Sequence, residues 1–190
     1  GRWHTVVCLA SGPSLNRADA DAVQAWRQAE EGRAVIVANT SFRMAPWADA
    51  LFAMDVDWWR TFIEEVKADF RGQRFSSNKL PAEFQVKHLM RSHFNAHHNS
   101  GCGAIALAVQ AGARRVLMLG YDCQKTGGQA HWHADYKKLG NAGSIEKWPA
   151  RFQSLADECK GVEIINCSRE TALEVFPRMS LEDALEQVAA

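Results

Sequence analysis

The sequence predicts an α/β protein with a doubly wound, mostly parallel sheet. Short apolar runs alternate with segments of helical spacing, which is typical of parallel strands joined by helical crossovers. Polar residues follow directly after each apolar run, and no internal repeat or low-complexity tract interrupts this order. The chain has 190 residues, 47% of them hydrophobic, which is enough for one sizeable core. We therefore expect a single domain over residues 1–190.

The first half of the chain contains the clearest strand and helix signals. Asn16 can cap a helix that begins at Arg17 and runs to Glu30. The segment between Asp55 and Phe70 also has helical spacing, with aromatic residues on one stripe. Three apolar runs predict buried strands at residues 6–10, 34–38 and 51–54.

The second half repeats this alternation after an irregular segment. Residues 71–98 predict connecting loops or a lid, with one candidate strand at 85–90. Ser100-Gly101 opens a strongly patterned helix that ends near Gly112. The polar, Gly-rich stretch 124–143 predicts a second lid or acceptor loop. The remaining elements are strands at 115–120 and 162–166, a helix at 145–159, and a last helix capped by Ser180.

Composition argues against several classes of partner. Lys and Arg total 22, as do Asp and Glu, so no basic excess points to duplex nucleic acid or a membrane surface. The five cysteines are scattered without a CxxC pair and predict reduced, mostly buried thiols. No segment resembles a signal peptide, and no apolar run approaches the ~18 residues of a membrane span. We expect a cytoplasmic protein.

Polar residues gather where the predicted strands end. Because the carboxyl ends of parallel strands meet at one rim, these residues predict a small-molecule site there. The Gly-Pro-Ser turn at Gly12 enters a helix N-terminus, whose unpaired N–H groups can hold an anion such as a pyrophosphate. A plain strand-to-helix turn is the alternative. The residues in question are Ser11, Gly12, Pro13 and Ser14, Asn39, Thr40 and Ser41, Asp55, Asp122, and Asn166, Cys167 and Ser168.

The order of these motifs resembles a known group of proteins. GPSL after the first strand, Asn39 after the second, Asn99-Ser100-Gly101 opening a helix, and Gly120-Tyr121-Asp122 after a later strand resemble bacterial lipooligosaccharide sialyltransferases. They also resemble the related archaeal-type 6-hydroxymethylpterin diphosphokinases. The combination SGPSL, APWAD, NSG, GYD, HWH and INCSRETAL is similar, over nearly the whole chain, to small proteins encoded by tailed phages. This resemblance implies a Rossmann-like nucleotide-binding domain, in the host cytoplasm if phage-encoded.

The resemblance also implies roles for individual residues. Ser100 and Gly101 would approach the nucleotide, and Asn166 to Ser168 would close the pocket around its base or sugar. Phosphates, ribose or donor sugar would meet Ser11, Gly12, Pro13, Ser14, Asn39, Thr40 and Asp55.

The general base implied by the resemblance is a histidine between the Gly-x-Asp strand and the next helix. Here that segment holds His131 and His133, beside Asp122 as a further catalytic candidate. Histidine suits the role because its unperturbed pKa of ~6.5 lets it accept a hydroxyl proton near neutrality. His133 is preferred because Asp135 could orient it.

Three functions remain open from sequence. The first is a nucleotide-sugar-dependent glycosyltransferase, sialyltransferase-like, with a small-molecule nucleotide donor and a hydroxyl acceptor. The second is an ATP-dependent diphosphokinase in which Asp55 and Asp122 hold Mg or Mn. The third is a non-catalytic phage accessory binding module. Acceptor recognition would come from residues 71–98, residues 124–143 or a second subunit, which leaves a homo-oligomer open.

Overall fold

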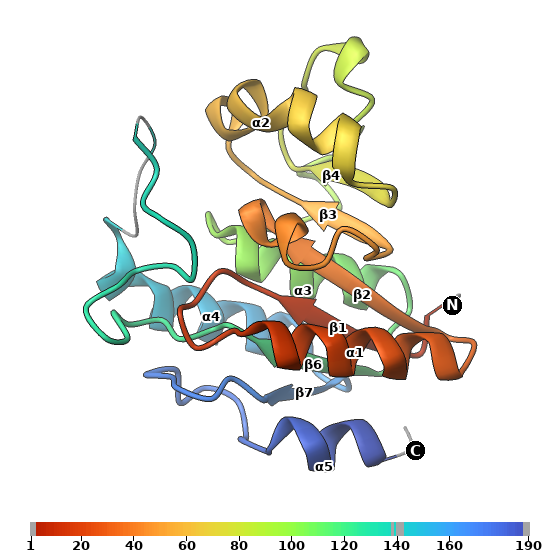
Figure 1. The fold of residues 1–190 in the computed structure, drawn as a ribbon, viewed down its shortest axis with the longest axis vertical. Coiled ribbons are helices and arrows are strands. Elements are labelled where there is room, and N and C mark those ends of the chain that lie inside the picture. Colours follow the sequence, from red (N-terminus) through yellow and green to blue (C-terminus); the bar gives the residue numbers. More distant parts are fainter. Residues whose placement is uncertain (1–2, 138, 140–142, 188–190) are drawn as a thin grey trace.

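A seven-stranded sheet forms the centre of the molecule. The computed structural model describes residues 3–137, 139 and 143–187. The strands run in the order β5-β4-β3-β2-β1-β6-β7, and every adjacent pair is parallel (Figure 1). They are β1 (Thr5–Leu9), β2 (Arg33–Ala38), β3 (Ala50–Phe52), β4 (Gln73–Ser76), β5 (Lys87–His88), β6 (Arg115–Leu119) and β7 (Glu163–Asn166). The predicted Rossmann-like α/β fold, in one domain, is confirmed.

Helices cover both faces of this sheet. Side chains of α1, α2 and α5 pack in one buried cluster with one set of strand residues, and side chains of α3 and α4 pack in a second cluster with the alternate set. The central strands β1, β2, β3 and β6 are buried on both faces, which explains their continuous apolar runs. The helices are α1 (Arg17–Ala29), α2 (Val56–Asp69), α3 (Ser100–Gln110), α4 (Trp148–Glu158) and α5 (Leu181–Glu186), with short 3₁₀ helices η1 (Asn39–Arg43), η2 (Ala82–Phe84) and η3 (Ile145–Lys147).

The order in which strands are added to the sheet reverses at β1. From β1 the chain adds β2 to β5 on one side, and it then returns through α3 to place β6 on the other side of β1. In open parallel sheets this reversal leaves a crevice beyond the carboxyl ends of the strands, where ligands bind. The two turns that border the crevice are the Gly-Pro-Ser turn after β1 and the Gly-Tyr-Asp turn after β6.

Residues 71–98 differ from the expectation of loops or a lid. Their segments β4 and β5 extend the sheet at its edge. The candidate strand at 85–90 shrinks to two residues, Lys87–His88. Neither strand has an apolar run, because β4 is partly exposed and β5 fully so. An edge strand needs little apolar surface, and the sequence pattern therefore does not show it.

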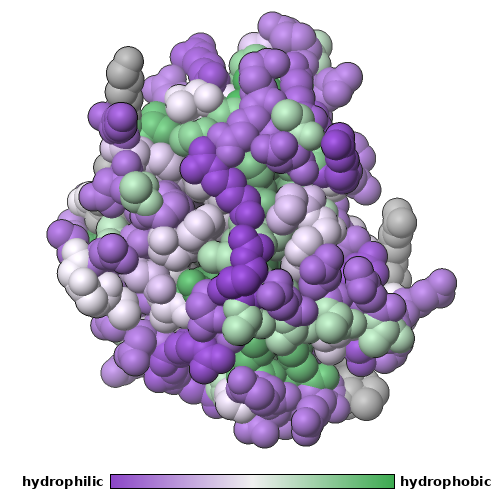
Figure 2. Space-filling view, in the orientation of Figure 1, coloured by the Kyte–Doolittle hydropathy of each residue, from purple (hydrophilic) through white to green (hydrophobic). Residues whose placement is uncertain are grey.

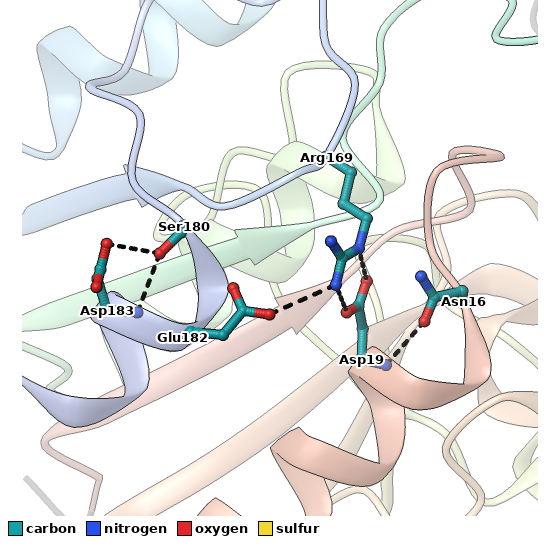
Figure 3. Close-up of polar contacts among 6 residues, drawn as sticks. All are labelled: Asn16, Asp19, Arg169, Ser180, Glu182 and Asp183. Atoms are coloured by element: carbon teal, nitrogen blue, oxygen red, sulfur yellow. Dashed lines mark hydrogen bonds and ion pairs between the residues drawn. The ribbon is translucent and has the colours of Figure 1, made fainter.

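Polar side chains fix the helix ends and the C-terminal segment. The Asn16 and Ser180 side chains accept from the backbone N–H of Asp19 and Asp183, as expected of N-caps. Arg169, just after β7, donates to both carboxylate oxygens of Asp19, at 3.0 and 2.6 Å, and lies 3.6 Å from Glu182 (Figure 3). The C-terminal segment is thereby held against α1.

Hydrophilic residues cover most of the face seen in Figure 2, but a green band crosses its lower half where α1 lies. Helix α1 has four exposed alanines, Ala18, Ala22, Ala25 and Ala29. The described residues include no helix long and apolar enough to span a membrane. All five cysteines are free and four are buried, as predicted.

Candidate functional site

A cavity of about 530 Å³ lies beyond the carboxyl ends of the strands, at the reversal beside β1. This volume is within the usual range for small-molecule sites. Its walls come from the turns after β1, β2, β3 and β6, from the first turns of α3 and α4, and from the segment that follows β6. In Figure 1 that segment, in green to teal, extends past the strand ends.

A buried carboxylate joins the two turns that border the crevice. Asp122 is 1% exposed, and its Oδ1 accepts from the Ser14 hydroxyl at 2.6 Å. Its Oδ2 accepts from the Ser14 backbone N–H at 2.9 Å and from the Thr126 hydroxyl at 2.8 Å. The Gly12 N–H donates to the carbonyl of Gly120 at 2.7 Å. We call these contacts the β1–β6 clasp.

The clasp changes what the Gly-Pro-Ser turn can offer a ligand. The N–H groups of Gly12, Ser14 and Leu15 all have protein acceptors, and Pro13 has none to offer. A Cβ on Gly12 would lie 2.1 Å from Asp122 Oδ1, so only glycine fits this approach. An anion of the protein itself therefore occupies the turn predicted to hold a phosphate.

Several residues around the cavity have uncommon backbone conformations. Asn39, His98 and Cys123 line it with φ values of 50°, 53° and 51°, and the neighbouring His97 has 49°. Such angles are rare for residues other than glycine and concentrate at functional sites. The Asn39 side chain also has a buried Oδ1 that no described residue contacts as a donor. Asn39 is thus available to bind a ligand's N–H or O–H group.

The segment after β6 is held over the cavity by contacts to the strand ends. Trp132 donates its backbone N–H to the Ser11 carbonyl at 3.0 Å and its indole N–H to the Ser41 hydroxyl at 3.2 Å. The Tyr136 hydroxyl lies 2.5 Å from the Thr40 hydroxyl. These contacts bring the two histidines of the segment to the β1–β2 end of the site.

His131 and His133 stack with their ring centroids 4.9 Å apart and their planes 7° apart. His131 lines the cavity and His133 does not. His133 Nδ1 lies 2.8 Å from the Ala134 carbonyl, so that nitrogen carries the proton. The Nε2 atoms of both rings are buried without a hydrogen-bond partner in the described structure.

Burial sets the protonation of both rings. It lowers the pKa of His131 to about 4, with His133 as the second cause, and it also lowers the pKa of His133. Both imidazoles are therefore neutral at pH 7. A neutral imidazole with an unpartnered nitrogen can accept a proton. The cavity favours His131 for that role over the sequence preference for His133.

The opposite wall is built by the first turns of α3 and α4. Asn99 caps α3, its side chain accepting from Cys102 N–H at 3.1 Å, and Ser100 Oγ accepts from Met54 N–H at 3.1 Å. From α4, Trp148, Arg151 and Phe152 face the cavity. Arg151 donates to the His98 carbonyl at 2.7 Å. The sequence pattern did not mark these α4 residues as part of a site, although their i, i+3, i+4 spacing is a signal that they share one face.

Carboxylates line the β3 end of the cavity. Asp55 and Asp57 both belong to the lining, and the pKa of Asp55 is raised by burial and then by the charge of Asp57. The described residues contain no group of three or more His, Cys, Asp or Glu side chains able to hold a metal ion. Both Asp122 oxygens already accept hydrogen bonds in the clasp. The residues present therefore do not form a site for Mg or Mn by themselves.

The structure brings together about half of the residues predicted from sequence. Those that line the cavity are Ser11, Gly12, Asn39, Asp55, Ser100, Gly101, Asp122 and His131. Outside the lining lie Pro13, Ser14, Thr40, His133, Asn166 and Ser168. Asn166 and Ser168 are 0% and 2% exposed and bond within the protein, Ser168 Oγ accepting from Tyr121 N–H at 2.8 Å. Their expected contact with a base or sugar has no geometry to support it.

Comparison with known proteins gives a fold. No family model matches the sequence, and neither does a curated protein. Among solved structures, MAf glycosyltransferase from Magnetospirillum magneticum AMB-1 is similar, with a TM-score of 0.69 and 16% identity. The match covers 95% of this chain and 34% of that one, so this chain spans about a third of the matched protein. The chain has a Rossmann-like fold of the kind found in a glycosyltransferase.

Proposed function

We propose that this protein is a nucleotide-sugar-dependent glycosyltransferase in which His131 is the general base. The observation that carries the proposal is the state of that side chain. His131 lines the cavity with a buried Nε2 that has no partner among the described residues, and its lowered pKa keeps the ring neutral. A neutral imidazole that lines a site of ligand size is what a general base requires.

The chemistry follows from this geometry. An acceptor hydroxyl placed against His131 would give its proton to the imidazole as its oxygen bonds to the anomeric carbon of the donor sugar. The bond between that carbon and the phosphate oxygen breaks, and the electron pair leaves on the phosphate. A base with a pKa of about 4 is weak, but its ring is neutral at pH 7 and can accept the proton as the acceptor oxygen bonds to carbon.

The similarity of fold supports this class of reaction by analogy, and the cavity supports a nucleotide-sized ligand. Support for the diphosphokinase is weaker. That reaction needs a metal ion held by carboxylates, and Asp122 is committed to the clasp. We therefore place donor recognition and proton transfer on residues of this one cavity and route no step through a metal ion.

The first test is a thermal-shift titration with CMP, UDP, GDP, ADP and ATP, each with and without magnesium or manganese. A ligand at ~100 times its dissociation constant raises stability by roughly 2.7 kcal/mol. A metal-independent shift with a nucleoside mono- or diphosphate supports the proposal and identifies the donor base. A shift with ATP and metal alone would support phosphotransfer, and no shift with any of them would contradict both reactions.

The second test separates the base from the binding site. With the donor identified, His131→Asn should lower the rate of transfer by about 10²–10⁴-fold while leaving donor binding within threefold, since general base catalysis contributes that much. His88→Asn is the matched control, because His88 is exposed on β5 and outside the cavity. Equal rates for His131→Asn and the wild type would refute the assignment.

A further inference from the structure

Arg151 has an unusual position for a charged side chain of this protein. It is the one Lys or Arg among the described residues that line the cavity. It projects from the first turn of α4 and is only partly exposed. Within the described part of the chain it takes part in no ion pair, whereas the buried guanidinium of Arg115 pairs with Glu163.

One hydrogen bond to the described residues holds the Arg151 guanidinium in place and leaves its other donors for a ligand. Its Nη1 donates to the His98 carbonyl at 2.7 Å, which uses one of the five N–H donors of an arginine. A second contact fixes the same segment to α4, since His97 Nε2 lies 2.9 Å from Glu158 Oε2. Arg151 is thus anchored against a segment with two left-handed residues, and it lines the cavity with four N–H donors that no described residue is shown to accept.

The surroundings of Arg151 add to its positive charge. Its guanidinium lies near the first turn of α3, where it partly offsets the effect of burial, the main cause that raises the pKa of Cys102. Asn99 satisfies the N–H of Cys102, but no described residue accepts from the N–H groups of Ser100 or Gly101. Ser100 and Gly101, at the positive end of the helix dipole, line the same cavity as Arg151.

The cavity holds charges of both signs. Asp55 and Asp57 follow β3 and Asp122 is enclosed in the clasp, whereas Arg151 comes from the first turn of α4. The clasp also removes the Gly-Pro-Ser turn as a source of N–H donors. An anionic group in this cavity is attracted to Arg151 and repelled by Asp55 and Asp57.

We propose that Arg151 is the anion-binding residue of the site and that it holds the phosphate of the nucleotide donor. The proposal rests on the proposed function for the identity of the ligand. Bidentate donation from a guanidinium to two phosphate oxygens is a common geometry for this recognition. It places the phosphate of the donor at the first turn of α4, beside the guanidinium.

Calorimetric titration with nucleosides and their 5′-monophosphates, with cytidine, uridine, guanosine and adenosine in turn, tests the assignment. The wild type should bind one monophosphate at least tenfold more tightly than its nucleoside. Arg151→Gln should weaken the monophosphate about tenfold or more and leave the nucleoside within threefold, because hydrogen bonds to charged groups contribute about 1.5–3 kcal/mol. Arg151→Lys keeps the charge but not the paired N–H donors of the guanidinium, and its affinity for the monophosphate should lie between those of the wild type and Arg151→Gln.

Lys147→Gln is the matched control. It removes the same charge one turn earlier, from an exposed residue that does not line the cavity, and it should leave both affinities unchanged. Melting temperatures of the variants show whether Arg151→Gln is folded, and Arg151→Lys keeps the test valid if it is not. An unchanged preference for the monophosphate in Arg151→Gln would overturn the assignment while nucleotide binding stands.

Two further ligands separate the proposals. Inorganic pyrophosphate tests the anion site without a base, so pyrophosphate binding that Arg151→Gln abolishes would retain the anion site even if no nucleotide binds and the proposed function fails. A free sugar acid tests the other source of negative charge. If Arg151→Gln weakens the sugar acid and leaves the monophosphate unaffected, Arg151 binds a sugar carboxylate and the phosphate assignment is wrong.

Discussion

The β1–β6 clasp allows a quantitative prediction, because it depends on one buried carboxylate. Asp122→Ala removes three hydrogen bonds to a charged acceptor. The loss of each costs about 1.5–3 kcal/mol if the donor left behind stays buried. The hydroxyls of Ser14 and Thr126 are only partly buried and can turn to water, so the full sum is not expected. We expect a loss of about 3–5 kcal/mol in the free energy of unfolding.

A double-mutant cycle with Ser14→Ala isolates the contact between the two turns. Ser14→Ala removes the hydroxyl and keeps the backbone N–H, so it should cost about 1.5–3 kcal/mol and couple to Asp122→Ala by about 1 kcal/mol or more. Urea unfolding measures all four proteins. Asp157→Ala is the control, since this exposed carboxylate of α4 accepts a hydrogen bond only from Gln153 among the described residues and should change stability by less than about 0.5 kcal/mol. Additive effects of the two substitutions in the clasp would refute the reasoning.

Three other perturbations test separate parts of the structure. Gly12→Ala places a methyl group 2.1 Å from Asp122 Oδ1, so urea unfolding should show a loss of about 1–3 kcal/mol in the free energy of unfolding. An unchanged free energy would mean that the turn can shift to accommodate the methyl group without cost. The pKa of His131, about 4 because of burial and then of His133, lies below its unfolded value of about 6.5, so this side chain should cost stability as the pH falls from ~6.5 to ~4. The melting temperature of His131→Asn should therefore fall less over that pH range than that of the wild type. Equal dependence of the two melting temperatures on pH would contradict the protonation state assigned to His131. Arg169→Gln leaves the Asp19 carboxylate, 2% exposed, without its doubly bonded partner and should cost about 1–3 kcal/mol in chemical unfolding, whereas an unchanged midpoint would show that solvent replaces the pair.

The sequence pattern predicts the central sheet because burial and composition agree there. The apolar runs at β1, β2 and β6 lie between two helical layers, so every side chain of these strands must be apolar or buried. Helix starts were predicted equally well, since Asn16 and Ser180 cap the helices that they were expected to cap. The edge strands β4 and β5 could not be predicted in the same way, because partly exposed strands need no apolar run.

The sequence predicts the site residues only in part, for a different reason. Polarity after a strand shows that a residue is at the rim, but it does not show whether its hydrogen bonds go to a ligand or to the protein. Ser168 and Asn166 are polar because they shape the turn after β7 and bond it to the turn after β6. Arg151 lies on a helix far along the chain, and only the packing of α4 beside α3 brings it to the cavity.

The clasp also bears on where negative charge belongs in this site. A phosphate at the Gly-Pro-Ser turn would have to lie beside Asp122, whose carboxylate already accepts from Ser14 N–H, and two anions sharing those donors would repel each other. Arg151, by contrast, takes part in no ion pair within the described part of the chain, and no described residue accepts from the N–H groups of Ser100 or Gly101. The carboxylate that closes the crevice between β1 and β6 therefore disfavours an anionic ligand at the Gly-Pro-Ser turn and favours one beside Arg151.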